Sequence, residues 1–137
     1  MDSRQLIGKI KALNLPEEEY LVAGGAVLAI HGIRGCADID IAVTPQVFAD
    51  FKSRGWEEKP SEWGSRIFRR GDFEVGEVLV LKDYRPTFQE LRARAEMFEG
   101  VPFASLEDTL SLKKALGREK DQEDILLIKE YLRSKTG

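Results

Sequence analysis

Apolar residues recur along the chain with two spacings, and these spacings predict where helices and strands lie. Leu6, Ile7 and Ile10 are three to four residues apart, as on one face of an amphipathic helix, and Asp2 or Ser3 stands where a cap is expected. Thr44 before Pro45 is a second helix start, because Pro is favoured at the first helical position. The expected helices cover residues 3–13, 26–31, 45–54, 86–99, 105–116 and 119–133, with a frayed tail over 134–137.

The remaining apolar runs predict strands. Residues 38–43 alternate acidic and branched apolar side chains, which is typical of a half-buried strand. Gly71 marks the turn of an antiparallel hairpin, and Pro102 limits its own segment to a short strand at a sheet edge. The expected strands cover residues 20–23, 38–43, 56–59, 63–69, 73–81 and 101–103. Helices and strands interleave without strict βαβ alternation, which predicts one α+β (mixed α/β) domain over residues 1–137 with a partly antiparallel sheet.

Composition narrows the class of protein. In 137 residues, 42% are hydrophobic and 33% are charged, which excludes a disordered or low-complexity chain. The 21 Lys and Arg against 24 Asp and Glu leave a net charge of −3, so nucleic acid or an anionic membrane has to be held by a local patch. The single cysteine, Cys36, excludes an internal disulfide. With no apolar signal segment or membrane span in the sequence, we expect a cytoplasmic protein without a membrane partner.

The acidic face of the strand over 38–43 is the first candidate for chemistry. Asp38 and Asp40 are two residues apart, so their carboxylates project from one face about 6.6 Å apart along the backbone. Their repulsion is relieved by solvent, by a basic side chain or by a divalent cation such as Mg²⁺. The other interpretation is a solvent-facing edge strand that happens to carry two aspartates.

Gly24 and Gly25 stand between an apolar strand and a helix. Glycines there let a phosphate approach the backbone N–H groups at the positive end of the helix. A tight strand-to-helix turn with no ligand accounts for a Gly-Gly pair equally well.

A third carboxylate is expected from the next long strand, and two residues qualify. Simple alternation leaves Glu74 on the polar face, with Phe73 and Val75 inward. Glu77 fits as well if Gly76 makes a bulge. The two glutamates cannot share a face of a regular strand, and we favour Glu74 because it needs no bulge.

Taken together, the strand, Gly24-Gly25, the helix and Asp38-Ile39-Asp40-Ile41 resemble the signature of the nucleotidyltransferase superfamily that includes DNA polymerase beta. The resemblance is closest to minimal nucleotidyltransferase-like proteins, many of them halves of toxin-antitoxin or phage-defence pairs. It covers most of the chain. Other residues that such proteins often carry are matched here by Arg34, Lys113, Gly117-Arg118, Lys120-Asp121 and Asp124. Cys36 departs from the pattern, where Thr is frequent.

The resemblance implies a mixed sheet flanked by helices, with Mg²⁺ held by three carboxylates, here Asp38, Asp40 and Glu74. It also implies transfer of a nucleoside monophosphate from a nucleoside triphosphate with release of pyrophosphate. Substrate binding then falls to Gly24, Gly25, Arg34, Lys113 and Arg118. The acceptor is expected from outside the chain, as a partner protein, a tRNA end or a small molecule, and assembly as a homodimer or hetero-complex is compatible with the small size.

Several of these side chains have a second interpretation. Lys113 and Arg118 either bind substrate or pair with Asp121 and Asp124 to hold the last two helices together. His31, the single histidine, is expected to be packed or hydrogen-bonded and not a catalytic base. The hairpin arginines are expected to form a solvated edge more readily than a binding surface; they are Arg66, Arg69 and Arg70.

Two functional hypotheses follow from different classes. The first is a Mg²⁺-dependent nucleotidyltransferase, and the second is a catalytically silent domain of the same fold that acts as a protein-binding or antitoxin-type module. A generic α+β domain without a site would leave the Gly-Gly and Asp-Ile-Asp patterns as coincidence. The geometric criterion is whether Asp38, Asp40 and one of Glu74 or Glu77 meet around one open point.

Overall fold

The computed structural model describes residues 1–61, 64–81 and 83–136. A 3₁₀ turn over Glu17–Glu19 precedes the first strand. The helices are α1 (Ser3–Ala12), α2 (Gly25–Ile30), α3 (Pro45–Ser53), α4 (Phe88–Ala93), α5 (Leu106–Leu116) and α6 (Glu119–Thr136). The strands are β1 (Tyr20–Ala23), β2 (Ile39–Val43), β3 (Glu57–Pro60), β4 (Arg66–Arg70), β5 (Phe73–Gly76), β6 (Glu96–Phe98) and β7 (Val101–Phe103).

These strands form one mixed sheet in the order β3-β4-β5-β2-β1-β7-β6. The β2–β5 and β1–β7 pairs are parallel, and the other neighbouring strands are antiparallel. With six helices around this sheet in the described part of the chain, the α+β class expected from the sequence is confirmed. Within the same residues, no helix is both long and apolar enough to cross a bilayer.

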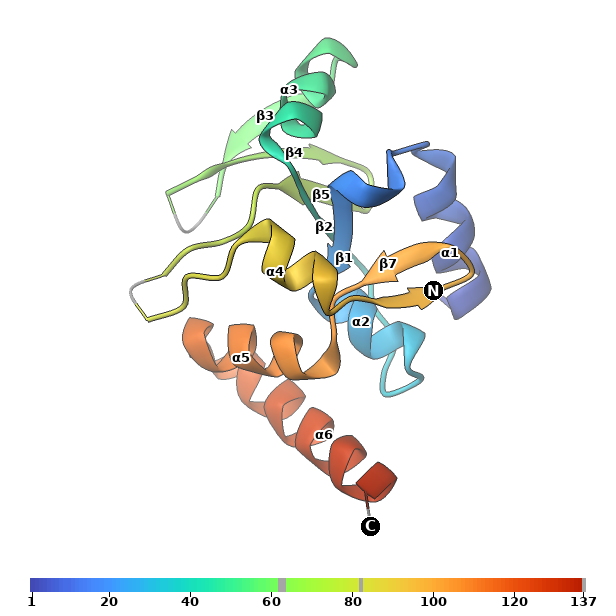
Figure 1. Cartoon of the computed structure of the whole chain (residues 1–137), viewed down its shortest axis with the longest axis vertical. Helices are drawn as coiled ribbons and strands as arrows, with labels where there is room; N and C mark the ends of the chain where they lie inside the picture. Colours follow the sequence, from blue (N-terminus) through green and yellow to red (C-terminus); the bar gives the residue numbers. More distant parts are fainter. Residues whose placement is uncertain (62–63, 82, 137) are drawn as a thin grey trace.

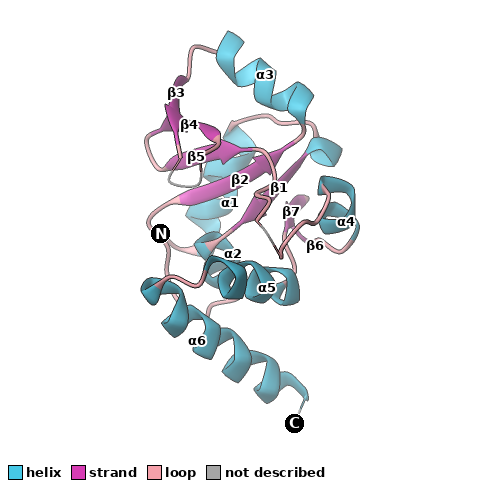
Figure 2. Cartoon of the chain, turned by 90° about the vertical axis from the view of Figure 1, so that its left-hand side faces the viewer, coloured by secondary structure: helices cyan, strands magenta, loops and turns pink. Residues whose placement is uncertain are grey.

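One face of the sheet carries the hydrophobic core. On β2 the burial alternates as the sequence predicts, with Ile39, Ile41 and Val43 buried and Asp40 and Ala42 half-buried. The helices α1, α2 and α3 cover this core side; in Figure 2 the strands β1 and β2 cross in front of α1. Removing these apolar side chains from water is the main favourable term that holds the sheet and these helices together.

The helices α4 and α5 lie apart from α1, α2 and α3, and each adds a buried leucine to the core, Leu91 and Leu106. Figure 1 shows α5 below the sheet, with α6 stacked beneath it and ending at the C-terminus, while α3 lies at the opposite end of the molecule. Ser105 caps α5 by accepting a hydrogen bond from the Asp108 amide at 3.0 Å, and Gly117 ends it in the left-handed conformation. The turn at Gly117 reverses the chain so that α6 packs along α5.

The helix expected over residues 86–99 is wrong in its second half. The helix α4 ends at Ala93, and Glu96–Phe98 instead form β6, which pairs with β7 across a tight turn. Glu99 and Gly100 occupy that turn with φ of 50° and 82°, the left-handed values that a two-residue hairpin requires. Gly100, the residue directly after the expected helix, is therefore part of a hairpin turn.

The segment around Pro102 is also placed differently from expectation. The strand β7 lies inside the sheet, between β1 and β6, and not at an edge. In the pairing of β7 with β1, Phe103 lies opposite Val22. The next residue, Ala104, donates its N–H to the Val22 carbonyl at 2.8 Å. The pairing with β1 thus begins after Pro102, so the missing N–H of the proline interrupts no ladder there.

Three further boundaries differ from the sequence prediction. The strand β5 ends at Gly76, not at residue 81, and it is regular, without a bulge, in its pairing with β2. The helix α6 continues through Thr136, so the expected frayed tail is wrong up to that residue. Trp63, the predicted first residue of the hairpin, lies outside the described residues, and β4 begins at Arg66.

Substituting Phe68→Ala tests the core between β4 and α3. Phe68 is 1% exposed and contacts Phe48 and Phe51, with ring centroids 4.7 and 6.1 Å away. We expect a loss of about 3–5 kcal/mol in the free energy of unfolding, because the substitution leaves a cavity. Urea denaturation measures it, and Arg66→Ala, at the exposed first position of the same strand, should change stability by less than about 0.5 kcal/mol. Equal effects of the two substitutions would contradict this packing.

Candidate functional site

Three adjacent strands bring Gly24, Asp40 and Glu74 to one place. Ala23, the last residue of β1, pairs with Asp40 on β2, and Asp40 pairs with Glu74 on β5. Gly24 follows directly, with φ of +65°, a conformation that favours glycine. A Cβ at Gly24 would also collide with the Asp40 carboxylate, so this position requires glycine for two independent reasons.

The Asp40 carboxyl group has an unusual electrostatic environment. Burial raises its pKa from 3.8 to about 7, and the charge of Glu74 together with a hydrogen bond between the two carboxyl groups adds to the rise. Asp38 acts in the same direction, while Lys113 opposes the rise. The pair therefore holds a proton more strongly than an ordinary aspartate, and a cation binding there would take the place of that proton.

Asp38 lies just before β2 and is turned toward the hairpin. Its Oδ1 is 3.8 Å from Nη2 of Arg69, and both side chains are about half exposed. Among the residues that the structure describes, no three carboxylate, imidazole or thiol groups are close enough to hold one metal ion together. Of the three carboxylates named by the sequence analysis, Asp40 and Glu74 come together, and Asp38 stays beside them in an ion pair.

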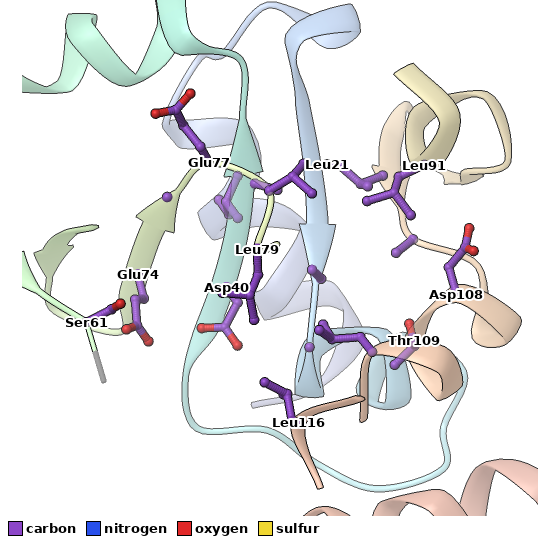
Figure 3. A pocket seen from close by; sticks show the side chains of 18 of the residues that line it. Leu21, Asp40, Ser61, Glu74, Glu77, Leu79, Leu91, Asp108, Thr109 and Leu116 are labelled. Atoms are coloured by element: carbon purple, nitrogen blue, oxygen red, sulfur yellow. The ribbon is translucent and has the colours of Figure 1, made fainter. Parts of the chain in front are cut away.

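The structure distinguishes the two glutamates that alternation left open. Glu74 is in register with Asp40, whereas Glu77 follows the end of β5. Figure 3 shows the carboxyl groups of Asp40 and Glu74 pointing into the same region, while Glu77 points away from it. The regular pairing of Gly76 with Ala42 excludes the bulge that Glu77 would have needed.

The three predicted substrate-binding cations are held in ion pairs with α6. Arg34 donates two hydrogen bonds of 2.7 Å to Asp124, and its guanidinium lies against Gly25. Lys113 contacts Asp124 at 2.9 Å and Asp121 at 3.3 Å. Arg118 contacts Asp121 at 2.7 Å. Of the two interpretations of Lys113 and Arg118, these contacts correspond to the structural one, and they extend it to Arg34.

Hydrogen bonding from Arg34 and Lys113 lowers the pKa of Asp124 to about 2, with the Arg34 contribution the larger. The side chains of Asp121 and Asp124 are only 1% and 8% exposed, so these two anions depend on their cations for compensation. The resulting cluster joins the loop after α2 to α5 and α6, and it holds the guanidinium of Arg34 against the Gly24-Gly25 turn.

A cavity of about 250 Å³ opens beside the carboxylate pair. Its walls include Gly24, Asp40, Glu74, Lys113 and Arg118 from the sequence prediction. Most of the remaining lining is apolar and comes from the sheet, from the segment after β5 and from α5; examples are Leu21, Ile67, Leu79, Leu91, Leu112 and Leu116 (Figure 3). A small ligand with an apolar part is compatible with this shape.

Sequence reasoning missed one feature of this site and gave less weight to another. The sequence favours a solvated edge over triphosphate or acceptor binding for Arg69, and the structure places Arg69 half exposed, in register with Glu74 and in contact with Asp38. The apolar wall was missed because its residues come from segments far apart in the chain. A signal for Arg69 did exist, since it alternates with Phe68, which is a core residue.

His31 conforms to the expected packed role. Its side chain is 9% exposed and makes edge contacts with the rings of Phe98 and Tyr131 at 5.3 and 5.6 Å. It lies away from the carboxylate pair and does not line the cavity beside it.

Replacing Asp40 with Asn changes how stability depends on pH. The folded-state pKa of about 7 lies above 3.8, so Asp40 keeps its proton more readily in the folded than in the unfolded state. Its contribution therefore opposes folding increasingly as pH rises from about 4 to 7 and stays constant above that. Without added metal, we expect Asp40→Asn to stabilise the protein by a few kcal/mol at about pH 8 and much less near pH 4.

Chemical denaturation of both proteins across this pH range measures the difference, with EDTA present. The matched control is Asp50→Asn on the exposed face of α3, which should leave the pH profile of the wild type unchanged. A difference between Asp40→Asn and wild type that is the same at every pH would contradict the raised pKa.

Asp124→Asn tests the ion-pair cluster. The substitution removes the negative charge that compensates Arg34 and Lys113, and Lys113 is nearly buried. We expect a loss of about 3 kcal/mol in the free energy of unfolding, since breaking a buried pair leaves an uncompensated charge. Glu123→Gln, exposed on the neighbouring position of α6, should have little effect. Thermal unfolding at neutral pH compares the two, and similar melting temperatures would contradict the structural importance of the cluster.

Comparison with known proteins adds no further constraint on this site. No protein-family model, no curated protein and no solved structure matched the chain. The roles of Asp40, Glu74 and their neighbours are therefore argued from the geometry and chemistry described above.

Proposed function

We propose that this protein is a Mg²⁺-dependent nucleotidyltransferase that transfers a nucleoside monophosphate from a nucleoside triphosphate to an acceptor oxygen. The acceptor oxygen attacks the α-phosphorus, the bond to the leaving pyrophosphate breaks, and the acceptor proton passes to a base or to water. The acceptor is a partner protein, an RNA end or a small molecule. The proposal agrees with the resemblance of the Gly24-Gly25 and Asp38-Ile39-Asp40 patterns to this superfamily.

The observation that carries the proposal is the register that sets Asp40 beside Glu74 and directly against the Gly24 turn. Two adjacent carboxylates, one of them with its pKa raised to about 7, form a site where a cation can take the place of a proton. A structural role alone gives no reason to hold two like charges together at the wall of a cavity.

The donor set fits Mg²⁺. This ion prefers oxygen ligands and is commonly bound through one or two carboxylates plus water and substrate phosphates. Asp40 and Glu74 would hold it, with Asp38 near enough to influence the charge of Asp40. When bound, the ion supplies positive charge that offsets the triphosphate and lowers the pKa of an attacking hydroxyl.

The chain itself supplies position and exclusion of water. The Gly24-Gly25 turn packs closely against two charged side chains, with the Asp40 carboxylate against Gly24 and the Arg34 guanidinium against Gly25. Arg34 is anchored in this position by Asp124. The apolar walls of the adjoining cavity would exclude water from a ligand group placed there.

A second candidate function is a catalytically silent domain of this fold that binds a partner protein. The specific observation in its favour is that the charged residues around the site are already engaged in ion pairs. Asp38 is paired with Arg69, and the cations Arg34, Lys113 and Arg118 are paired with aspartates of α6. In a silent module these pairs would be permanent, and no cation would need to leave them.

Transfer assays with each labelled nucleoside triphosphate, Mg²⁺ and candidate protein and RNA acceptors test the proposal. We expect Mg²⁺-dependent labelling by the wild type and a loss of about 100-fold or more in rate for Asp40→Asn and for Glu74→Gln, since each removes a metal-binding carboxylate. Glu77→Gln, the same change on the carboxylate that points away, should retain most of the activity.

Two outcomes separate the candidates. Absence of metal-dependent transfer, with a partner bound equally by wild type and Asp40→Asn, would support the silent module and overturn the enzyme. Loss of transfer in Glu77→Gln but not in Glu74→Gln would contradict the site as assigned here.

A further inference from the structure

The cations around the carboxylate pair differ in how firmly they are held. Arg34, Lys113 and Arg118 make ion pairs of 2.7–3.3 Å with Asp121 or Asp124. Both aspartates are almost fully buried. Turning any of these cations toward a ligand would leave a buried carboxylate short of compensation, which is strongly unfavourable. These three side chains are therefore poorly suited to bind a phosphate group.

Arg69 is held differently. Its Nη2 atom is 3.8 Å from Oδ1 of Asp38, which is longer than a hydrogen bond. The two side chains are 45% and 57% exposed, and an exposed pair of this kind contributes little to stability. Arg69 can leave Asp38 for another anion without exposing a buried charge.

The sheet places Arg69 in the same row as the carboxylate pair. Arg69 on β4 is in register with Glu74 on β5, and Glu74 is in register with Asp40 on β2. Side chains in one such row project from the same face of a sheet. Ile67, two residues before Arg69 on β4, lines the cavity beside the pair, so Arg69 projects from the same face of the sheet, although it is not itself a lining residue of that cavity.

We propose that Arg69 binds phosphate oxygens of the nucleoside triphosphate at this site, and that metal binding releases it from Asp38. The inference rests on the proposed function and adds to it a phosphate-binding residue and an order of events. Before the metal binds, Arg69 partly offsets the charge of Asp38. The positive charge of a divalent cation held by Asp40 and Glu74 offsets the neighbouring charge of Asp38, which weakens the attraction between Asp38 and Arg69 and frees the guanidinium for the phosphates.

The chemistry of the side chain suits this role. A guanidinium presents several N–H donors in a planar fork that matches phosphate oxygens, and it keeps its charge at any physiological pH. The row of side chains also indicates where the triphosphate would lie, because Arg69 is beside Glu74 on the side away from Gly24. The triphosphate would then extend from the Gly24 turn across the carboxylates toward β4.

Calorimetric titration of Arg69→Gln with inorganic triphosphate in the presence of Mg²⁺ tests the proposal. We expect the affinity for triphosphate to fall by about tenfold or more, because a charged bidentate contact is lost. The affinity for Mn²⁺ alone, followed by its paramagnetic resonance signal, should be unchanged or higher, since a competing cation has been removed. Arg69→Lys keeps the charge but loses the fork, and it should recover only part of the triphosphate affinity.

The matched control is Arg66→Gln, on the same strand but on the opposite face, where Arg66 pairs with Glu58 at 3.3 Å. It should leave both affinities unchanged. Triphosphate affinity in Arg69→Gln equal to that of the wild type, or an equal loss in Arg66→Gln, would overturn the role of Arg69. Circular dichroism of each variant checks that the sheet is intact.

These results separate the two proposals. Wild-type transfer that Arg69→Gln leaves unaltered, together with unaltered triphosphate binding, would overturn the inference and leave the nucleotidyltransferase proposal standing. Triphosphate binding that depends on Arg69, without transfer to any acceptor, would support the phosphate site and count against the enzyme. A wild type that binds neither Mn²⁺ nor triphosphate would overturn both.

Discussion

The register of β1, β2 and β5 is the constraint on which the candidate site depends. It pairs Ala23 with Asp40 and Asp40 with Glu74, so a turn and two carboxylates from three segments share one place. The register is itself set by the core face of the same strands. Ile39, Ile41 and Val75 must all point inward, and a slip of one residue would turn them to solvent and Asp40 into the core. Hydrophobic burial therefore holds the polar site in position.

The same region holds one unfavourable and one favourable set of charges: the carboxyl pair on β2 and β5, and the ion-pair cluster that joins α5 and α6. Burial of Asp40, together with the charge of the neighbouring Glu74, raises the pKa of Asp40 to about 7. The cluster of Arg34, Lys113 and Arg118 with two buried aspartates has well-matched charges and joins α5 and α6 to the loop after α2. The matched cluster stabilises the scaffold, and the unmatched pair is the part of the molecule that gains most from binding a cation.

The distribution of cations bears directly on mechanism. Residues that a family resemblance suggests for substrate binding are here engaged in structural pairs, while an arginine from the outer hairpin has the loose pairing that ligand binding requires. The resemblance and the geometry thus coincide at Asp40, Glu74 and the Gly24 turn, whereas Asp38 lies in an ion pair with Arg69 and the cation that we propose for the phosphates is a different one. The difference arises because a cation's availability depends on its partners and not on its position in a motif.

The sequence by itself determined the features that short-range interactions decide. The cap before the first helix, the helix start at Thr44, the alternation on β2 and the strand-to-helix turn at Gly24 involve groups a few residues apart, and these were predicted correctly. Tertiary structure alone decided the parallel pairing of β2 with β5, the place of β7 between β1 and β6, and the contact of Arg34 with Asp124, 90 residues away. Whether such contacts form depends on which faces of the helices and strands are buried together, and on how many residues separate the two partners in the sequence. For the same reason, alternation could favour Glu74 over Glu77, but only the assembled sheet could set Glu74 beside Asp40 and Arg69.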